Sequence, residues 1–346
     1  MSETRAMVGT AALGRAIDAF GAPLDGLPPI DGVRVRLERS VALPLQRRAV
    51  AQPLWTGVRC IDALLTIGRG ARVGIFGAPG AGKSTLLEQV VRGAHVDAVA
   101  IGLVGERGRE AQRWIELRND RTTVICATSD RSAHERVRAA QLTMVHAQRL
   151  AAGGLHVLVL LDSLARYVYA LREIAVGAGE SVGRAGYPPS VFAAAARLVE
   201  RAGAFSSGSI TLLATVLSDG DDRDPVSEAA RSLLDGHVVL SPRLAQAGRF
   251  PAIDVPASAS RTMGEVIAPE HAAAAARVRA ALARLDHFED ARSLGLEPSD
   301  PATIAAIRAE TAIEALVRQD RRLESPARTL EALRESADML EVTHGY

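Results

Sequence analysis

Lysine is almost missing from this sequence. Lys83 is the only lysine in a chain of 346 residues with 41 basic residues, so all the others are arginines. A lysine ammonium is a compact point charge on a flexible stem, whereas the arginine guanidinium is a planar fork, and the two are not interchangeable where geometry matters. The single lysine therefore indicates one position where an arginine cannot serve.

Other features are also scarce. The two cysteines, Cys60 and Cys126, are too few for a disulfide framework or a zinc site, and we expect both to be packing residues in a reducing compartment. The eight histidines lack paired helical spacing, so no resident metal site is predicted. No apolar run approaches about 18 residues and the N-terminus lacks a secretory signal, which indicates a cytoplasmic protein. A net charge of +1 gives no footprint for nucleic acid or a membrane surface.

The pattern along the chain predicts an α/β fold. Residues 1–54 are rich in turn signals and are read as a lead-in, with a possible strand at 33–37. From Arg72 onward, apolar runs alternate with amphipathic stretches, as in parallel βαβ units. Residues 55–265 are therefore assigned to one α/β domain with a mainly parallel sheet. The predicted strands are 72–76, 98–104, 122–127, 156–161, 209–217 and 238–240, and the predicted helices are 84–93, 109–118, 132–152, 163–176 and 225–234.

The last part of the sequence has no strand signal. Its alanine- and arginine-rich stretches predict helices at 270–288, 301–319 and 326–340, and residues 266–346 are assigned to a small helical C-terminal domain. The five alanines at 272–276 favour a packed helix over a low-complexity segment, because alanine has the highest helix propensity.

A phosphate-binding loop surrounds the single lysine. The segment Gly77-Ala78-Pro79-Gly80-Ala81-Gly82-Lys83-Ser84, followed by Thr85, fits the pattern G-x-x-x-x-G-K-[ST] between a predicted strand and a predicted helix. Glycines let backbone N–H groups turn toward a phosphate, and the helix N-terminus adds positive potential. The loop predicts ATP as ligand, with Lys83 at the β- and γ-phosphates and Ser84 as a ligand of Mg²⁺. The competing interpretation is a glycine turn that only caps a helix.

Two acidic residues end buried strands and could complete a hydrolytic site. Asp162 closes the run His-Val-Leu-Val-Leu-Leu-Asp, and we expect it to organise Mg²⁺ through its water shell, although it could instead cap the next helix. Glu106 follows the strand that ends at Val104 and is the candidate base for the attacking water, unless it belongs to a solvated turn. An arginine is also needed at the γ-phosphate, but composition cannot choose among the arginines.

Several long motifs together resemble one family. They are the phosphate loop, GERGRE at 105–110, CATSDRS at 126–132, DSLARYVYALREIAVGAGE at 162–180, GYPPSVFAAAARLVERAG at 186–203 and RFPAIDVPASASR at 249–261. In this order they resemble the export ATPases of type III secretion systems, relatives of the catalytic subunits of rotary ATP synthases. The TSDRS and RYVYALREIAVGAGE segments favour the injectisome branch over the flagellar one. The resemblance implies a RecA-like P-loop core and an ATPase that releases chaperones from export substrates and unfolds the cargo.

The resemblance also implies residue roles. Glu106 matches the catalytic glutamate of the family, with Arg107 next to it in the G-E-R motif. Arg166 matches an arginine near the γ-phosphate, with a surface ion pair as the alternative. Arg261 matches the arginine finger that enters the neighbouring subunit's site. Phe250 matches an aromatic residue that stacks on adenine, with core packing as the alternative.

The resemblance further implies partners and an assembly. Family members form hexamers and work with chaperone–substrate complexes, a central stalk and regulators, and they reach the cytoplasmic face of the inner membrane through these partners. Family members usually carry a β-barrel domain before this segment; we expect most of that domain to be missing here and hexamer formation to be weakened. The alternatives from the residues are a rotary-type subunit, an RNA-dependent hexameric translocase, for which no single-strand platform is visible, and a nucleotide-gated scaffold with little turnover.

Overall fold

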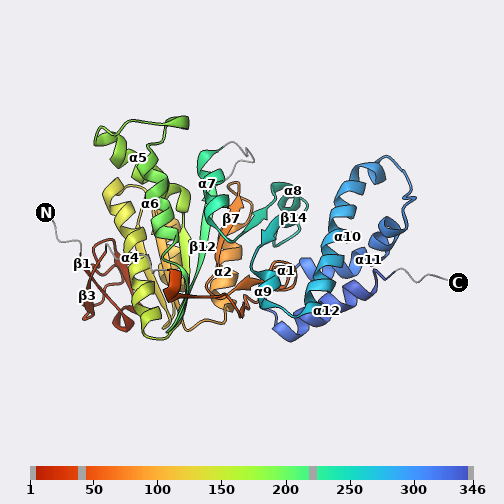
Figure 1. Cartoon of the computed structure of the whole chain (residues 1–346), viewed down its shortest axis with the longest axis horizontal. Helices are drawn as coiled ribbons and strands as arrows, with labels where there is room; N and C mark the ends of the chain where they lie inside the picture. Colours follow the sequence, from red (N-terminus) through yellow and green to blue (C-terminus); the bar gives the residue numbers. More distant parts are fainter. Residues whose placement is uncertain (1–4, 38–43, 218–223, 342–346) are drawn as a thin grey trace. The chain divides into compact units, whose positions relative to one another are not determined.

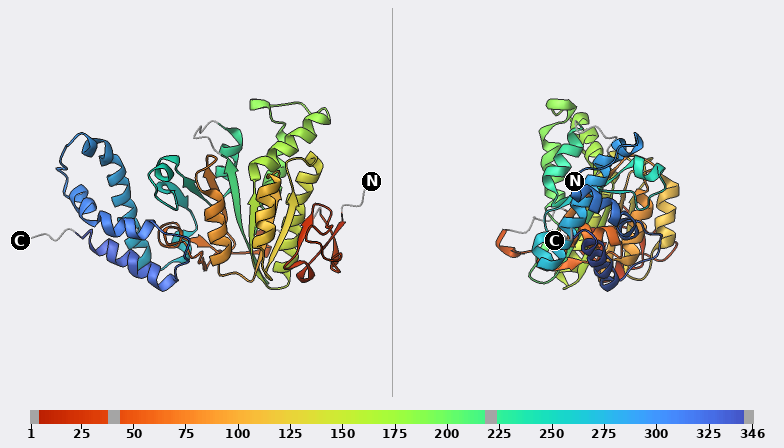
Figure 2. Two further views of the ribbon diagram at one scale, coloured as in Figure 1. Left: turned by 180° about the vertical axis from the view of Figure 1, so that it is seen from behind. Right: turned by 90° about the vertical axis from the view of Figure 1, so that its right-hand side faces the viewer.

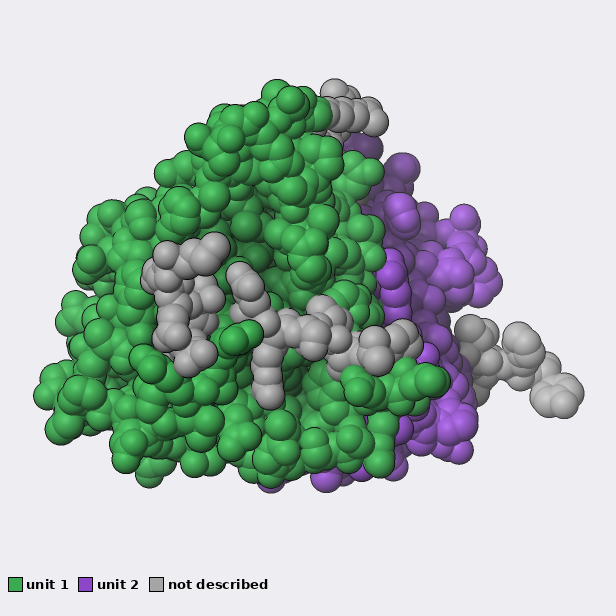
Figure 3. Space-filling model, turned by 60° about the vertical axis from the view of Figure 1, so that its left-hand side comes forward, with its two compact units in different colours: residues 1–50, 69–76, 96–235 green, residues 51–68, 77–95, 236–346 purple. Residues whose placement is uncertain are grey.

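The chain was analysed as a computed structural model that describes residues 5–37, 44–217 and 224–341. It forms two compact units, which interleave along the sequence (Figure 3). Unit 1 comprises residues 1–50, 69–76 and 96–235, and unit 2 comprises residues 51–68, 77–95 and 236–346. This division does not follow the domain boundaries expected after residues 54 and 265, and it does not test them. Those domain boundaries stay a prediction.

Unit 1 is built on a mainly parallel sheet. Its strands follow the order β7-β12-β10-β8-β9-β2, and the pairs from β12 to β2 are all parallel. A short strand β11 pairs antiparallel with β12 and with β4, and β1 and β3 form a separate hairpin. The strands are β1 (Arg5–Val8), β2 (Ala16–Asp18), β3 (Val33–Arg36), β4 (Arg47–Arg48), β7 (Arg72–Gly77), β8 (Ala98–Val104), β9 (Thr122–Ala127), β10 (His156–Asp162), β11 (Gly203–Phe205) and β12 (Ser209–Leu217).

Helices cover this sheet. The long helix α4 packs on β8, β9 and β10, and α5 packs on β12 and on its neighbours α4 and α6 (Figures 1 and 2). All seven residues of β8 are buried, as a strand covered on both faces requires. The helices of unit 1 are α3 (Gly108–Leu117), α4 (Ala133–Ala152), α5 (Leu164–Gly177), α6 (Pro189–Val199) and α7 (Pro225–Leu233), with 3-10 turns at Thr10–Ala12, Pro44–Gln46 and Arg184–Gly186.

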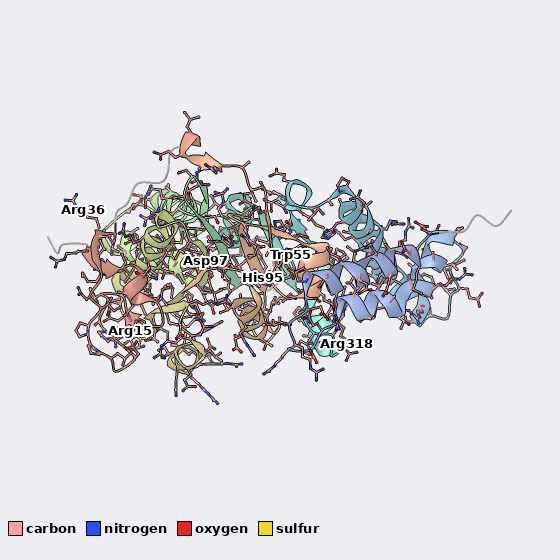
Figure 4. The ribbon with its side chains drawn as sticks, turned by 90° about the horizontal axis from the view of Figure 1, so that it is seen from below. Arg15, Arg36, Trp55, His95, Asp97 and Arg318 are labelled. Carbon is pink, nitrogen blue, oxygen red and sulfur yellow. The ribbon has the colours of Figure 1, made fainter. Side chains whose placement is uncertain are left out.

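Unit 2 combines the phosphate-loop helix with the C-terminal helices. Its strands form two antiparallel pairs, β13 with β14 and β5 with β6, and α10, α11 and α12 pack on one another (Figure 2). The Trp55 carbonyl accepts a hydrogen bond of 3.0 Å from the His95 N–H, which ties the β5 segment to the end of α2 (Figure 4). The elements are β5 (Pro53–Leu54), α1 (Arg59–Leu64), β6 (Ile67–Gly68), α2 (Lys83–Gly93), β13 (Gly236–Leu240), α8 (Pro242–Gln246), β14 (Ile253–Ser260), α9 (Met263–Val266), α10 (Pro269–Ser293), α11 (Pro301–Val317) and α12 (Pro326–Asp338).

Capping residues explain where several helices begin. Ser132 and Glu135 form a reciprocal capping box at the start of α4, as its sequence predicts. Asp224, Asp300 and Ser325 are N-cap residues, and the side chain of each accepts a hydrogen bond from a backbone N–H in the first turn of its helix. In each case the first residue of the helix is a proline. Proline lacks the N–H group that would be unpaired at the first helical position. An N-cap residue followed by proline therefore marks the start of a helix clearly in the sequence.

The predicted α/β class with a helical C-terminal part is confirmed. The strands predicted from Arg72 onward are present within two residues of the expected bounds, and both cysteines are buried, with burial raising the pKa of Cys60 to about 12. Among the elements that were not predicted are β14, helix α6 and the strand β2. The last extends the main sheet from within the lead-in, beside an ion pair of 2.8 Å between Arg15 and Asp25 (Figure 4).

Candidate active site

The phosphate loop has the conformation that its sequence predicts. Strand β7 ends at Gly77, and α2 begins at Lys83. Between them Gly80 and Gly82 have φ angles of +85° and +88°, in the left-handed region that glycine enters without a Cβ penalty. The Lys83 Nζ donates a hydrogen bond of 2.7 Å to the Gly77 carbonyl, so the ammonium lies across the loop. These features place the helix N-terminus and one cation at the same loop, as an anionic phosphate requires.

A cavity of about 320 Å³ adjoins this loop within unit 2. The Phe250 ring lies on its wall with 46% of the residue exposed, and the ring comes within 3.6 Å of the position that a Cβ on Gly82 would take. An exposed ring beside a phosphate loop can stack on a nucleotide base, whereas a core-packing phenylalanine would be buried. The cavity is lined by Gly82, Thr85, Leu86, Gln89, Leu240, Phe250, Pro251, Ala252, Gln319, Asp320 and Arg321.

In unit 1, Glu106, Asp162 and Arg166 lie together. Strands β8 and β10 are adjacent and parallel, with Asp162 opposite Leu103, so the residues that follow both strands meet at one sheet edge. Arg166, in the first turn of α5, forms an ion pair with Glu106 and donates a hydrogen bond of 2.7 Å to the Gly105 carbonyl. Asp162 accepts a hydrogen bond of 2.5 Å from the Thr215 hydroxyl. The proposed base and the proposed metal organiser therefore share one corner of the sheet.

Burial changes the acidity of Glu106. The residue is only 6% exposed, and burial, a hydrogen bond with Glu110 and the charge of Asp162 together raise the pKa of Glu106 to about 8. The Arg166 guanidinium acts in the opposite direction, because it favours the charged carboxylate. A carboxyl group with a raised pKa beside a second acid is the arrangement expected of an acid–base residue. Glu106 is therefore not part of a solvated turn.

Two further arginines predicted for the site have exposed side chains. Arg107 is exposed at the N-cap of α3, where its carbonyl accepts hydrogen bonds from Glu110 and Ala111. Arg261 is exposed directly after β14 and is not among the residues that line the cavity beside Phe250. Exposure suits a side chain that acts on a neighbouring molecule, but Arg261 keeps its assigned role only as a prediction.

Several residues that contact the site residues or line the cavity were not predicted from the sequence. Thr215 holds Asp162, and Glu110 modulates Glu106, but a threonine inside a strand and a glutamate on an exposed helix face carry no signal of their own. Gln89 and Gln319, which both line the cavity beside Phe250, are far apart in the chain and come together only in the fold. Only the motif GERGRE, which contains Glu110, could have drawn attention to one of them.

The acidic and hydroxyl groups present suit a magnesium ion better than a self-contained metal centre. Among the described residues no group of three or more His, Cys, Asp or Glu side chains could hold a metal ion. Mg²⁺ usually takes one or two protein oxygens and completes its shell with water and substrate phosphates, and a serine hydroxyl and a hydrogen-bonded carboxylate are such donors. None of the described helices is long and apolar enough to cross a membrane.

Comparison with known proteins gives consistent matches. Residues 57–260 match the family model of the ATP synthase alpha/beta family, nucleotide-binding domain. The chain is 45% identical to a type 3 secretion system ATPase of Xanthomonas euvesicatoria, over 83% of this chain and 67% of that protein. It is also 45% identical to the flagellum-specific ATP synthase of Salmonella typhimurium, over 90% of this chain and 71% of that protein. The assembled ATPase EscN in complex with its central stalk EscO, from enteropathogenic E. coli, has a chain of the same fold, with a TM-score of 0.90 and 38% identity over 96% of this chain and 83% of that one.

Proposed function

Since this chain belongs to the ATP synthase alpha/beta family, is homologous to the type 3 secretion system ATPases and hydrolyses ATP, we propose that its ATP hydrolysis drives type III protein export. In this proposal the energy of ATP releases chaperones from export substrates and unfolds the cargo. The observation that carries the hydrolytic part is that Glu106 and Asp162 lie where two adjacent strands end and that Arg166, in the first turn of α5, pairs with Glu106.

The chemistry assigns one task to each group. The backbone N–H groups of the phosphate loop and Lys83 bind the β- and γ-phosphates and offset their charge. Mg²⁺, held by Ser84 and through water by Asp162, would neutralise charge that develops on the phosphate oxygens. Glu106, once ionised, accepts a proton from the attacking water, and Arg166 both steadies its carboxylate and offers positive charge nearby. Phe250 stacks on the adenine ring.

We further propose that the catalytic unit is a ring of identical chains. The exposed position of Arg261 after β14 supports a role as an arginine finger that reaches the site of a neighbouring subunit. The assembled EscN in complex with its central stalk EscO, whose chain this one resembles, supports the same arrangement and a stalk partner. Regulators and chaperone–substrate complexes would be further partners, and export would place the ring at the cytoplasmic face of the inner membrane.

A complementation experiment tests the shared site. The variants Glu106→Gln and Arg261→Ala each remove one half of a site that two subunits complete, so each should bind ATP but turn it over at least about 100-fold more slowly. When the two variants are mixed, some sites receive an intact Glu106 from one chain and an intact Arg261 from the next. Partial recovery of ATPase activity is therefore expected, rising with protein concentration. Full activity of either variant alone, or no recovery on mixing at any concentration, would contradict the proposal.

The secretion role needs its own assay. In a strain whose own secretion ATPase gene is replaced by this one, wild-type chain should support export of a reporter substrate, and Glu106→Gln should not. Export through the injectisome but not through the flagellar apparatus would support the injectisome assignment. That assignment stays a prediction, because the chain is 45% identical both to a secretion ATPase and to a flagellar relative. Export that is unaffected by Glu106→Gln would separate this chain from the energy supply of secretion.

A further inference from the structure

Three residues that follow Arg318, the C-cap of α11, form one wall of the cavity beside Phe250, which we call the base cavity. They are Gln319, Asp320 and Arg321, and Gln319 is only 6% exposed. The Gln319 side chain makes three hydrogen bonds: Nε2 donates to the Gly57 carbonyl at 2.8 Å and to the Arg322 carbonyl at 2.6 Å, and Oε1 accepts from the Arg59 N–H at 2.8 Å. Its backbone N–H donates to the Phe250 carbonyl at 2.8 Å. Gln319 thus connects the wall to Phe250, the residue that carries the stacking ring.

A second buried amide reaches the same wall from the phosphate-loop helix. Gln89 is 7% exposed on α2, and its Nε2 lies 3.2 Å from the Asp320 carbonyl and 3.4 Å from the Arg322 carbonyl. Helix α2 begins at Lys83, so the rigid element that carries the phosphate end of the site also contacts the base wall. The separation between the phosphate loop and the wall is therefore fixed by hydrogen bonds to the wall's backbone.

The wall is also anchored at the end of α11. The Arg59 guanidinium donates to the carbonyls of Ala315 at 2.9 Å, Leu316 at 3.3 Å and Arg318 at 2.5 Å (Figure 4 labels Arg318). These carbonyls have no partner inside the helix, because the last turn of an α-helix leaves its C=O groups unpaired. The wall therefore follows a helix end whose carbonyls are hydrogen-bonded by Arg59. The side-chain hydrogen bonds of Gln319 then hold the backbone of the wall in place.

We propose that Gln319, with Gln89, is a positioning residue that holds the base-binding wall and so determines the affinity for the purine base. The inference rests on the proposed assignment of this cavity to ATP. If the amides are lost, the carbonyls of Gly57, Asp320 and Arg322 lose these donors and the wall loses its fixed position, whereas the phosphate contacts of Gly77–Ser84 are supplied by the loop itself. The effect is therefore confined to ligands that carry a base.

The test compares ATP with inorganic tripolyphosphate, which has the phosphates but no base. In calorimetric titrations, Gln319→Leu and Gln89→Leu should each weaken ATP binding by roughly tenfold, while tripolyphosphate binding keeps the wild-type affinity. In steady state, KM for ATP should rise with a much smaller change in kcat.

Two further variants make the result decisive. Ser325→Ala removes the N-cap of α12, so it loosens the C-terminal helices without touching the cavity and should leave ATP affinity unchanged. Phe250→Ala tests the cavity itself: if it leaves ATP affinity unchanged, the base-site assignment fails. If Phe250→Ala weakens ATP but Gln89→Leu and Gln319→Leu do not, or if they weaken tripolyphosphate equally, the positioning role is overturned. Should Gln319→Leu not fold, Gln89→Leu alone decides, by the same two titrations.

Discussion

The raised pKa of Glu106 predicts how ATPase activity should depend on pH. A general base works only in its ionised form, and burial, Glu110 and Asp162 hold the pKa of Glu106 at about 8. About a tenth of the carboxyl is then ionised at pH 7 and about half at pH 8. We therefore expect kcat/KM of the wild-type chain to rise roughly fivefold from pH 7 to pH 8 and to level off above pH 9.

The neighbour Glu110 allows the cause to be tested. Glu110 raises the pKa of Glu106 through a hydrogen bond, so Glu110→Gln should lower that pKa and move the rise in kcat/KM to lower pH. Glu116→Gln is the matched control, because Glu116 lies on the same helix and pairs with Gln112 instead. The control should leave the profile where it is.

The assay is steady-state phosphate release at saturating Mg²⁺, measured as kcat/KM between pH 6 and pH 9.5. A wild-type profile that is flat above pH 6 would show that no group with a pKa near 8 limits the reaction. A profile that rises but does not respond to Glu110→Gln would assign the titration to another group. Either result would refute the reasoning that links burial of Glu106 to catalysis.

Three more predictions concern the metal, the lysine and the fold. Lys83→Arg should weaken ATP binding by about 100-fold in calorimetry, because a planar fork cannot take the place of the ammonium across the loop; wild-type affinity would contradict the reading of the single lysine. Asp162→Asn should raise the Mg²⁺ concentration for half-maximal activity, measured by titrating metal into chelator-treated protein, while metal-free ATP binding stays the same; an unchanged Mg²⁺ dependence would remove Asp162 from the metal site. Ser132→Ala should lower the free energy of unfolding by about 1 kcal/mol in urea titrations, since it removes the capping box of α4, and an unmoved midpoint would count against that role.

Local patterns in the sequence were sufficient for most elements of the fold. The buried parallel strands β8, β9 and β10 are continuous apolar runs, and capping residues such as Ser132 mark where helices begin. Elements without such a local signal were missed. Strand β14 contains a proline and small polar residues, and β2 has only three residues, so neither shows the alternation that identifies a strand; both form because a neighbouring strand offers hydrogen bonds.

The sequence by itself determined the phosphate loop, because the motif from Gly77 to Ser84 acts through its own backbone and one side chain. It also pointed to Glu106 and Asp162 as strand-end acids, and the family motifs narrowed their roles. Only the tertiary structure decided the environment of these groups: the buried position that raises the pKa of Glu106, the Thr215 hydroxyl that holds Asp162, and the meeting of Gln89 with the wall at Gln319. Burial and contacts between distant segments depend on how the whole chain packs, and no local pattern encodes them.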